Sequence, residues 1–375
     1  MKNQFRSVTL ATTLLMMSIS ACSQVSDIET GSSDSTIDTQ LVTKGVDVPW
    51  GMAWINKTDF LVTDRKGELR LVKNGKLLTD PVSGVPEVVA KSQGGLLDVE
   101  VDPNFDKNSL VYLSYSGAGI SGTNTFIMRA KLSGQALTEQ KVIFQGSPAT
   151  TSGHHFGSRI EFDKKGYLYF SIGDRGNRDE NPQRLDRDAG KIHRIHSDGR
   201  IPQDNPFVAT QGANPSIYSY GHRNPQGMAM HPQTGRIWTH EHGPRGGDEI
   251  NLITAGLNYG WPVISYGVNY SGTSFTDLTE KEGMQQPVLH WTPSIAPSGL
   301  TFVTSDKYPQ WKGKMLVGSL KFQHLVLVEL DGDKVVRQSK ILEGIGRVRS
   351  LKQGADGYIY VGTDGTGIFK LVPTI

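Results

Sequence analysis

Six copies of one pattern, in which short apolar runs alternate with polar turns, constrain the fold of this chain more than any other feature. In the clearest copy, residues 158–162 lead through the turn Asp163-Lys164-Lys165-Gly166 to residues 167–174, and residues 191–196 follow. The first runs of the other copies are residues 50–54, 95–101, 227–231, 298–302 and 348–352. A sheet this small cannot bury both faces alone, so the copies must pack against one another.

The repeats predict an all-β fold, a six-bladed β-propeller of four-stranded antiparallel blades that occupies residues 41–375. Residues 40–46 are expected to pair with the last blade and close the ring. The insertions at 177–190 and 263–297 are expected to gather as loops around one mouth of the central channel. A β-sandwich with a second domain is the alternative, but the repeats span most of the chain.

The first 21 residues have the features of a bacterial lipoprotein signal peptide. Lys2 and Arg6 precede an apolar stretch at residues 8–19, and Ser20-Ala21-Cys22 resembles the end of a lipobox. Cys22 is the only cysteine, so no disulfide can form within one chain. An ordinary signal peptide with an incidental cysteine is the alternative. We expect a periplasmic protein, lipid-anchored to the outer membrane through Cys22, with residues 22–40 as a flexible tether.

The charge balance of the mature chain argues against a nucleic-acid partner. Cleavage after residue 21 removes Lys2 and Arg6, which leaves 37 of the 39 basic residues against 37 acidic ones. Such a neutral chain offers no broad basic face. Contact with a membrane is therefore expected only through the lipid.

Residues 216–262 concentrate Gly, Pro and charged residues at the ends of short apolar runs, as expected for the floor of an active site. Innermost strands line the channel of a propeller, and basic residues stand at these strands in two repeats: Arg223, Arg347 and Arg349. Lys321 lies at the end of a strand in the fifth repeat and is expected to point toward the same axis. Like charges that converge on one axis are costly unless an anion neutralises them. A polyanionic ligand is therefore indicated, unless Arg347 and Arg349 lie on a solvated blade edge.

Several motifs in order resemble the soluble pyrroloquinoline quinone (PQQ) dependent aldose dehydrogenases, the glucose/sorbosone dehydrogenase family, over roughly residues 45–372. They are residues 93–97, His155 with Arg159, residues 172–174, 221–227, 241–251, 258–262 and 319–321, and Arg347-Val348-Arg349. PQQ is an orthoquinone with three carboxylates, which agrees with the charge argument.

The resemblance implies a site that binds PQQ and Ca²⁺. The residues it assigns to PQQ are Gln93, His155, Arg223, Asn224, Lys321, Arg347 and Arg349. The main-chain carbonyls of Gly243 and Pro244 correspond to ligands of the cofactor's Ca²⁺, and Glu249 and Tyr259 to a further calcium site of some relatives.

The resemblance also implies oxidation of aldose sugars at C1 to the lactone, by hydride transfer to the quinone. His155 corresponds to the general base, Asp174 to the carboxylate that holds its tautomer, and Arg223 to a residue that polarises the quinone. His154 stands where glucose-oxidising relatives have an acidic residue, so we expect a broad or altered sugar preference. The electron acceptor is left open between a quinone, a cytochrome and a dye-like molecule, and the assembly between monomer and homodimer.

Other interpretations of these residues, structural or functional, stay open. His155 could be a hydrogen-bonded loop residue, and Asp174 could cap a turn. His240, Glu241, His242 and Asp248 have the composition of a zinc site. However, His240 and His242 alternate along a strand, and no third ligand stands at the spacing of a known zinc motif. A calcium-dependent lactonase or esterase propeller would need carboxylate and Asn ligands at the channel, and a non-catalytic binding propeller would not need the full set of basic residues.

Overall fold

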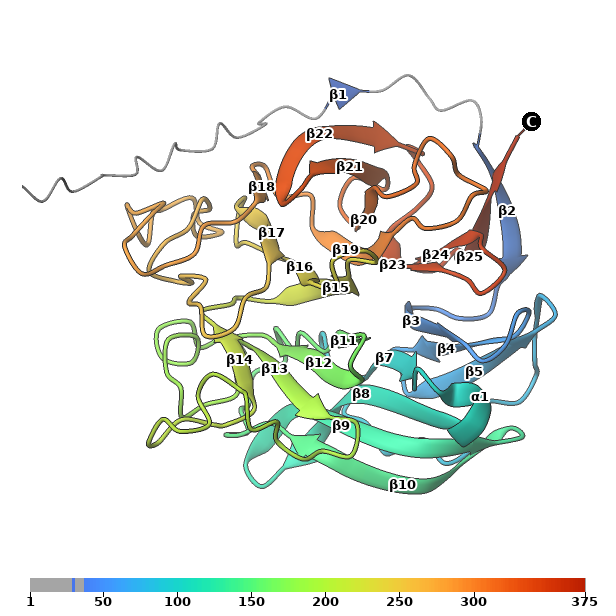
Figure 1. The fold of residues 1–375 in the computed structure, drawn as a ribbon, viewed down its shortest axis with the longest axis horizontal. Helices are drawn as coiled ribbons and strands as arrows, with labels where there is room; N and C mark the ends of the chain where they lie inside the picture. The colour runs from blue at the N-terminus through green and yellow to red at the C-terminus, as the bar shows by residue number, and fades with distance from the viewer. Residues whose placement is uncertain (1–28, 31–36, 375) are drawn as a thin grey trace, which may run out of the picture.

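The computed structural model describes residues 29–30 and 37–374, and the strands of this part of the chain form six sheets arranged in a ring (Figure 1). The sheets follow one another in chain order, and the first strand of each contacts the first strands of its neighbours around the axis. The prediction of a six-bladed β-propeller is confirmed.

The first three sheets take up the N-terminal half of the ring. The first contains β3 (Pro49–Trp54), β4 (Phe60–Asp64), β5 (Glu68–Lys73) and β6 (Lys76–Leu77). The second contains β7 (Leu96–Val101), β8 (Leu110–Gly119), β9 (Gly122–Ser133) and β10 (Ala136–Gln145). The third contains β11 (Ile160–Phe162), β12 (Tyr167–Ile172), β13 (Lys191–His196) and β14 (Ile217–Tyr220).

The other three sheets complete the ring. The fourth contains β15 (Pro225–Met230), β16 (Ile237–Glu241), β17 (Asp248–Leu252) and β18 (Leu289–Trp291). The fifth contains β19 (Pro297–Phe302), β20 (Met315–Ser319), β21 (Leu325–Asp331) and β22 (Lys334–Ile341), with β1 (Glu29–Thr30) parallel to β22. The sixth contains β23 (Val348–Gln353), β24 (Ile359–Thr363), β25 (Gly367–Pro373) and β2 (Ile37–Thr43).

The ring is closed by β2, which pairs antiparallel with β25 and so joins the two ends of the chain in one sheet. This strand begins at Ile37, three residues before the expected segment, and ends at Thr43. Residues 37–40 therefore lie in a strand, and the prediction that the flexible tether extends to residue 40 is wrong. Residues 1–28, with the predicted signal peptide and Cys22, lie outside the described part of the chain.

Helix contributes almost nothing to the described residues. Their only α-helix is α1 (Phe105–Asn108), a single turn between β7 and β8. Within the same residues no helix has the length and apolar character needed to cross a bilayer.

The hydrophobic core lies between neighbouring sheets. Leu61 and Leu69 of the first sheet, for example, pack with Leu96 and Leu113 of the second, and all four are fully buried. Because each sheet is covered on both faces, its inner strands are almost continuously apolar, as in residues 167–172 of β12. The repeated strand–turn–strand pattern of the sequence reflects this packing.

One buried side chain ties the sheets together at the axis. Arg159 of the third sheet donates to the main-chain oxygens of Gln226 (2.7 Å), Trp50 (2.8 Å) and Arg349 (3.0 Å), which belong to the fourth, first and sixth sheets. Its Nη1 also lies 3.4 Å from Oδ1 of Asp98 in the second sheet. Arg159 thus links five sheets, and three of its partners, Trp50, Gln226 and Arg349, belong to the wall of the cavity described below.

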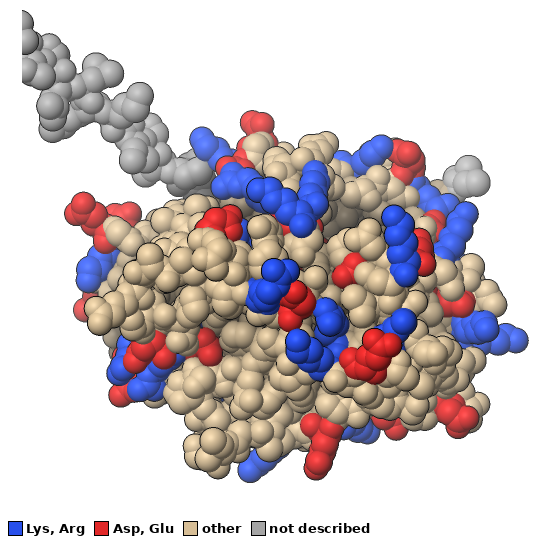
Figure 2. All heavy atoms as spheres, turned by 60° about the horizontal axis from the view of Figure 1, so that its bottom comes forward, with Lys and Arg blue, Asp and Glu red and all other residues tan. Residues whose placement is uncertain are grey.

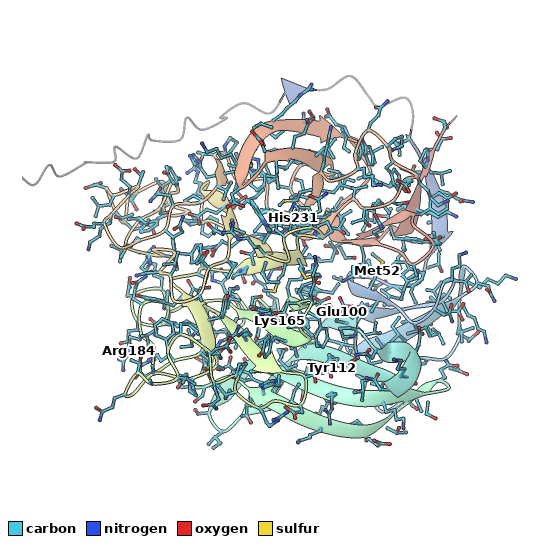
Figure 3. All side chains as sticks on the ribbon, in the orientation of Figure 1. Met52, Glu100, Tyr112, Lys165, Arg184 and His231 are labelled. Carbon is cyan, nitrogen blue, oxygen red and sulfur yellow. The ribbon has the colours of Figure 1, made fainter. Side chains whose placement is uncertain are left out.

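In Figure 3, which has the orientation of Figure 1, Met52 of β3 and Glu100 of β7 lie near the axis of the ring and Arg184 lies in a peripheral loop. Figure 2 shows basic and acidic side chains interleaved over another face, with broad uncharged areas between them. That face has the mixed charge of an ordinary solvated surface.

Candidate functional site

A cavity of about 1210 Å³ opens at one mouth of the channel. Its wall includes these predicted site residues: Gln93, Asn224, Gly243, Pro244, Lys321, Arg347 and Arg349. They come from sheets two, four, five and six or the loops beside them, so the ring brings together residues that are up to 256 positions apart in the chain. The size of the cavity is sufficient for a cofactor with a small substrate.

Three predicted catalytic residues, His155, Asp174 and Arg223, adjoin this wall. Asp174 and Arg223 are buried, whereas the side chain of His155 is 15% exposed. The main-chain N–H of His155 donates to Oε1 of Gln93 (2.8 Å), and Nη1 of Arg223 donates to the carbonyl oxygen of Gly243 (2.9 Å). Both residues therefore contact wall residues directly.

His155 and Asp174 form a closely paired dyad, with His155 Nδ1 2.6 Å from Asp174 Oδ1. A carboxylate only accepts, so the neutral ring carries its proton on Nδ1 and leaves the lone pair on Nε2. No described residue hydrogen-bonds that Nε2. The backbone of His155 is in the left-handed region (φ +54°), an uncommon conformation for a residue with a Cβ and one found often at functional sites.

The pKa values of the dyad favour a neutral imidazole beside a charged carboxylate. Burial lowers the pKa of His155 below its ordinary value, although the hydrogen bond and charge of Asp174 oppose this effect. For Asp174, burial alone would raise the pKa, but the hydrogen bond and charge of His155, with Arg223 and the N–H of Gly176, lower it overall. The ring is thus available to accept a proton near neutral pH.

Asp174 has two further donors that hold its carboxylate in place. Gly176 N–H donates to Oδ1 (2.7 Å), and the indole Nε1–H of Trp261 donates to Oδ2 (2.8 Å). The role of Trp261 was not predicted, although it belongs to a quoted motif, because nothing in a Trp-Pro pair indicates which carboxylate its N–H reaches.

Arg223 is fixed by the turn after β16. Its Nη1 donates to the carbonyl oxygens of His242 and Gly243, both at 2.9 Å, and its main-chain N–H donates to Glu241. Glu241 also accepts from Nδ1 of His222 (2.8 Å). The buried Nε of Arg223 has no partner among the described residues, so the guanidinium keeps unused donor capacity.

The Gly243-Pro244 turn is held by Asp248. Oδ1 of Asp248 accepts the N–H of Gly243 (2.9 Å), while Oδ2 accepts the N–H groups of Ile295 (2.8 Å) and Ala296 (3.0 Å). These bonds orient the backbone whose carbonyls are the predicted calcium ligands.

The zinc interpretation of this segment finds no support. Nε2 of His240 lies 3.1 Å from the carbonyl oxygen of Gly299, and Nε2 of His242 lies 2.8 Å from that of Pro297. Asp248 is occupied by backbone donors, and the part of the chain that is described contains no group of three or more His, Cys, Asp and Glu residues arranged to hold a metal.

The charged side chains of the cavity wall are predominantly basic. Among the described residues these are Arg65, Arg245, Lys321, Arg347 and Arg349, against one acidic residue, Asp364. Arg65 and Arg245 were not predicted, since neither stands at the start of an innermost strand.

Asp364 corrects the argument that only a ligand can neutralise these cations. It binds Arg349 through two parallel hydrogen bonds, Nε to Oδ1 (3.1 Å) and Nη2 to Oδ2 (2.8 Å), and lies 3.6 Å from Nε of Arg347. The sequence does not predict this contact, because Asp364 stands in an Asp-Gly pair, which is typical of a turn. One carboxylate still leaves the wall with a clear excess of positive charge.

Glu249 and Tyr259 lie outside the cavity wall: Glu249 is in β17 of the fourth sheet, and Tyr259 is in the loop after β17, where its N–H donates to Tyr220 of the third sheet (2.8 Å). Glu249 is opposite Glu241 in the β16–β17 ladder, and Asn251 Nδ2 donates to Oε1 of Glu241 (3.1 Å) and Oε2 of Glu249 (3.0 Å). Burial, followed by the charge of Glu241, raises the pKa of Glu249 to about 8. The ring of Tyr259 stacks on His222 at 4.6 Å between centroids.

This second cluster has the chemistry of a cation site. The buried Glu241 carboxylate faces the half-buried Glu249, and Oδ1 of Asn251 is buried without a donor within the described residues. Oxygen donors of this kind suit Ca²⁺.

Comparison with known proteins places this geometry in a family. The model of the "Glucose / Sorbosone dehydrogenase" family matches residues 46–370. The chain belongs to this family. The resemblance inferred from the motifs is therefore confirmed.

Members of the family that resemble the chain include proteins of known structure. The aldose sugar dehydrogenase YliI of Escherichia coli (strain K12) is 43% identical over 337 residues, which cover 88% of this chain and 91% of that protein. The apo-form crystal structure of the soluble aldose sugar dehydrogenase from Escherichia coli superposes with a TM-score of 0.87 at 41% identity, covering 90% of this chain and all of that one. The PQQ-bound aldose sugar dehydrogenase from Streptomyces coelicolor gives 0.72 at 28% identity, with coverage of 91% and 99%.

Proposed function

We propose that this protein is a PQQ- and Ca²⁺-dependent aldose dehydrogenase that oxidises the sugar at C1 to the lactone. The observation that carries the proposal is the position of the His155–Asp174 dyad next to a cavity with five basic and one acidic side chains. The names of the relatives, which are aldose sugar dehydrogenases and include a PQQ-bound form, support the substrate class and the cofactor.

The residues present fit a flat tricarboxylate. Lys321, Arg347 and Arg349 would bind its carboxylates. Arg347 can pair with a carboxylate through parallel hydrogen bonds, Lys321 provides an ammonium group, and Arg349, whose Nε and Nη2 are paired with Asp364, would use its remaining N–H groups. Gln93 and Asn224 would add hydrogen bonds from the same wall. The orphaned Nε and remaining N–H groups of Arg223 offer donors behind this wall.

The residues present also fit Ca²⁺, a hard cation that prefers oxygen ligands. The carbonyls of Gly243 and Pro244 would hold the ion beside the cofactor, while Glu249 and the carbonyl of Tyr259 would hold a second one. Bound PQQ supplies a quinone that accepts hydride, and Ca²⁺ increases its electrophilicity.

The protein's own contribution is to position and deprotonate the sugar. Nε2 of His155 would take the proton of the C1 hydroxyl while the hydrogen on C1 leaves with its electron pair. Asp174 keeps the Nδ1–H in place and stabilises the imidazolium that forms. Arg223 provides positive charge beside the reacting atoms.

The lactonase or esterase alternative has less support, since that chemistry calls for carboxylate and Asn ligands at the channel and the described wall has one acidic side chain.

For the location, we propose a periplasmic protein attached to the outer membrane through a lipid on Cys22, a proposal that depends on the lipobox-like sequence alone. Its partners would be aldoses and an electron acceptor of undetermined class.

Reconstitution tests the proposed activity. Cofactor-free protein given PQQ and Ca²⁺ should reduce a dye with a panel of aldoses, and His155→Ala should retain PQQ but lose turnover by roughly 100-fold or more. His231→Ala, at the opposite end of β15, is the control and should keep full activity. Absence of both activity and retained cofactor absorbance would reject the proposal, and turnover in His155→Ala would reject the base.

A further inference from the structure

We propose that Trp261 is a positioning residue for the His155–Asp174 dyad: its indole N–H holds the Asp174 carboxylate, and its ring supports Arg223. The inference deepens the proposed function, on which the meaning of the dyad depends. Trp261 would touch neither sugar nor cofactor and would act through its neighbours.

The first support is the hydrogen bonding of Asp174, whose carboxylate is buried. Oδ1 serves His155 and the N–H of Gly176, whereas the only donor to Oδ2 among the described residues is Nε1–H of Trp261 at 2.8 Å. The indole therefore sets the rotation of the carboxylate about its Cβ–Cγ bond, and through Oδ1 the orientation of the imidazole.

The second support is the rigidity of the indole itself. The main-chain N–H of Trp261 donates to Gly221 (2.9 Å), and Nε2 of Gln183 donates to its carbonyl oxygen (2.8 Å). Its ring contacts Phe275 in an edge arrangement with 5.2 Å between centroids. The side chain is almost completely buried, so its position is fixed from three sides.

The third support is its contact with Arg223, whose guanidinium carbon lies 5.3 Å from the centroid of the Trp261 ring. A cation over an indole face is attracted by the ring quadrupole. One side chain therefore contacts both the orienter of the proposed base and the cation beside it, which couples their positions.

The sign of the effect follows from the groups that face His155. These are Asp174, Arg223, His154 and His242. Loss of the indole N–H removes the one donor to Oδ2, so the negative charge of Asp174 is less stabilised by hydrogen bonds. This change favours the imidazolium, so the pKa of His155 should rise.

Trp261→Phe keeps most of the ring and removes the N–H. In cofactor-free protein, NMR titration should show the His155 pKa raised by at least about 0.5 unit. In an Asp174→Asn background the same substitution should shift it little. The reconstituted variant should lose roughly 10-fold in kcat/KM, and the acidic limb of its pH–rate profile should move to higher pH.

Trp291→Phe is the matched control, because Trp291 is a buried tryptophan whose Nε1 donates to Gln338 at the same 2.8 Å. It should leave the His155 pKa unchanged. A folded Trp261→Phe with an unchanged His155 pKa overturns the inference, as does an equal shift in Trp291→Phe.

A measurement on the unaltered protein guards against a variant that fails to fold. The indole Nε1–H resonance of Trp261 should move with the midpoint of the His155 titration, since both groups share Asp174. A Trp261 resonance that does not follow this titration overturns the inference. None of these NMR readouts requires PQQ, so they separate failure of the positioning role from failure of the proposed function.

Discussion

Replacement of Arg159 by Met should destabilise the propeller by about 3–5 kcal/mol, the usual cost of breaking a buried ion pair at one partner. The change removes three hydrogen bonds of 2.7–3.0 Å to main-chain oxygens in three sheets and leaves Asp98 buried with its charge uncompensated. The propeller at residues 41–375 gains about 0.7 kcal/mol/K of entropy on unfolding, so Tm should fall by roughly 4–7 °C.

Two variants make this prediction specific. Arg194→Met removes an arginine whose side chain is equally buried (8% exposed) and which donates to Asn205, but whose charge partner Asp204 is 65% exposed. It leaves no buried charge unpaired and should therefore cost less than Arg159→Met. Asp98→Asn combined with Arg159→Met removes the uncompensated charge and should recover part of the loss. Calorimetry and denaturant titration of the cofactor-free proteins provide the measurement. A cost for Arg159→Met no larger than that for Arg194→Met would refute the reasoning.

Three further predictions concern the site. Burial lowers the His155 pKa below 6.5, so in a pH–rate profile kcat/KM should be lost only as pH falls below that value, and Asp174→Asn should move the limb lower still; a limb above pH 6.5 contradicts this. Asp364→Asn keeps an acceptor but removes a negative charge, so calorimetric titration at low salt should show PQQ binding tighter by roughly 3–10-fold; weaker binding contradicts this. Asp248→Asn presents an amide N–H₂ to the donors around Gly243, so Ca²⁺ affinity, measured calorimetrically, should fall by roughly 10-fold; unchanged affinity contradicts this.

The fold could be predicted because each repeat carries its own local signal. The turn at residues 163–166 ends in Gly166, which adopts φ +78°, and the flanking apolar runs form β11 and β12 as expected. The exact closure was harder to predict. Residues 37–39 are polar apart from Ile37, and only pairing with β25 makes them a strand.

The site could be predicted only where a motif carried it. His155 and Arg223 precede innermost strands, Lys321 follows β20, and all three stand in recognisable sequence contexts. Asp364 instead contacts Arg349, 15 positions away in the chain, and Trp261 contacts Asp174, 87 positions away. No sequence periodicity relates the two residues of either pair. Such contacts follow from the arrangement of the blades in the ring, which local sequence does not specify.

Nor could the sequence indicate how far the basic residues are already neutralised. Asp364 occupies the Nε–Nη2 edge of the Arg349 guanidinium and makes a longer contact, 3.6 Å, with Nε of Arg347. If the contact of Asp364 with Arg349 is left out of account, the need for an anionic ligand is overstated. With it, the cavity is best described as preorganised and still positively charged.

Titration of cofactor-free protein with PQQ in the presence of Ca²⁺ tests the central claim most directly, because that claim is that the basic cavity at the channel mouth binds a tricarboxylate quinone. We predict saturable binding of one PQQ per chain, weakened by salt and weakened at least about 10-fold by Lys321→Ala or Arg349→Ala. No binding, or binding that neither salt nor these substitutions affect, would contradict it.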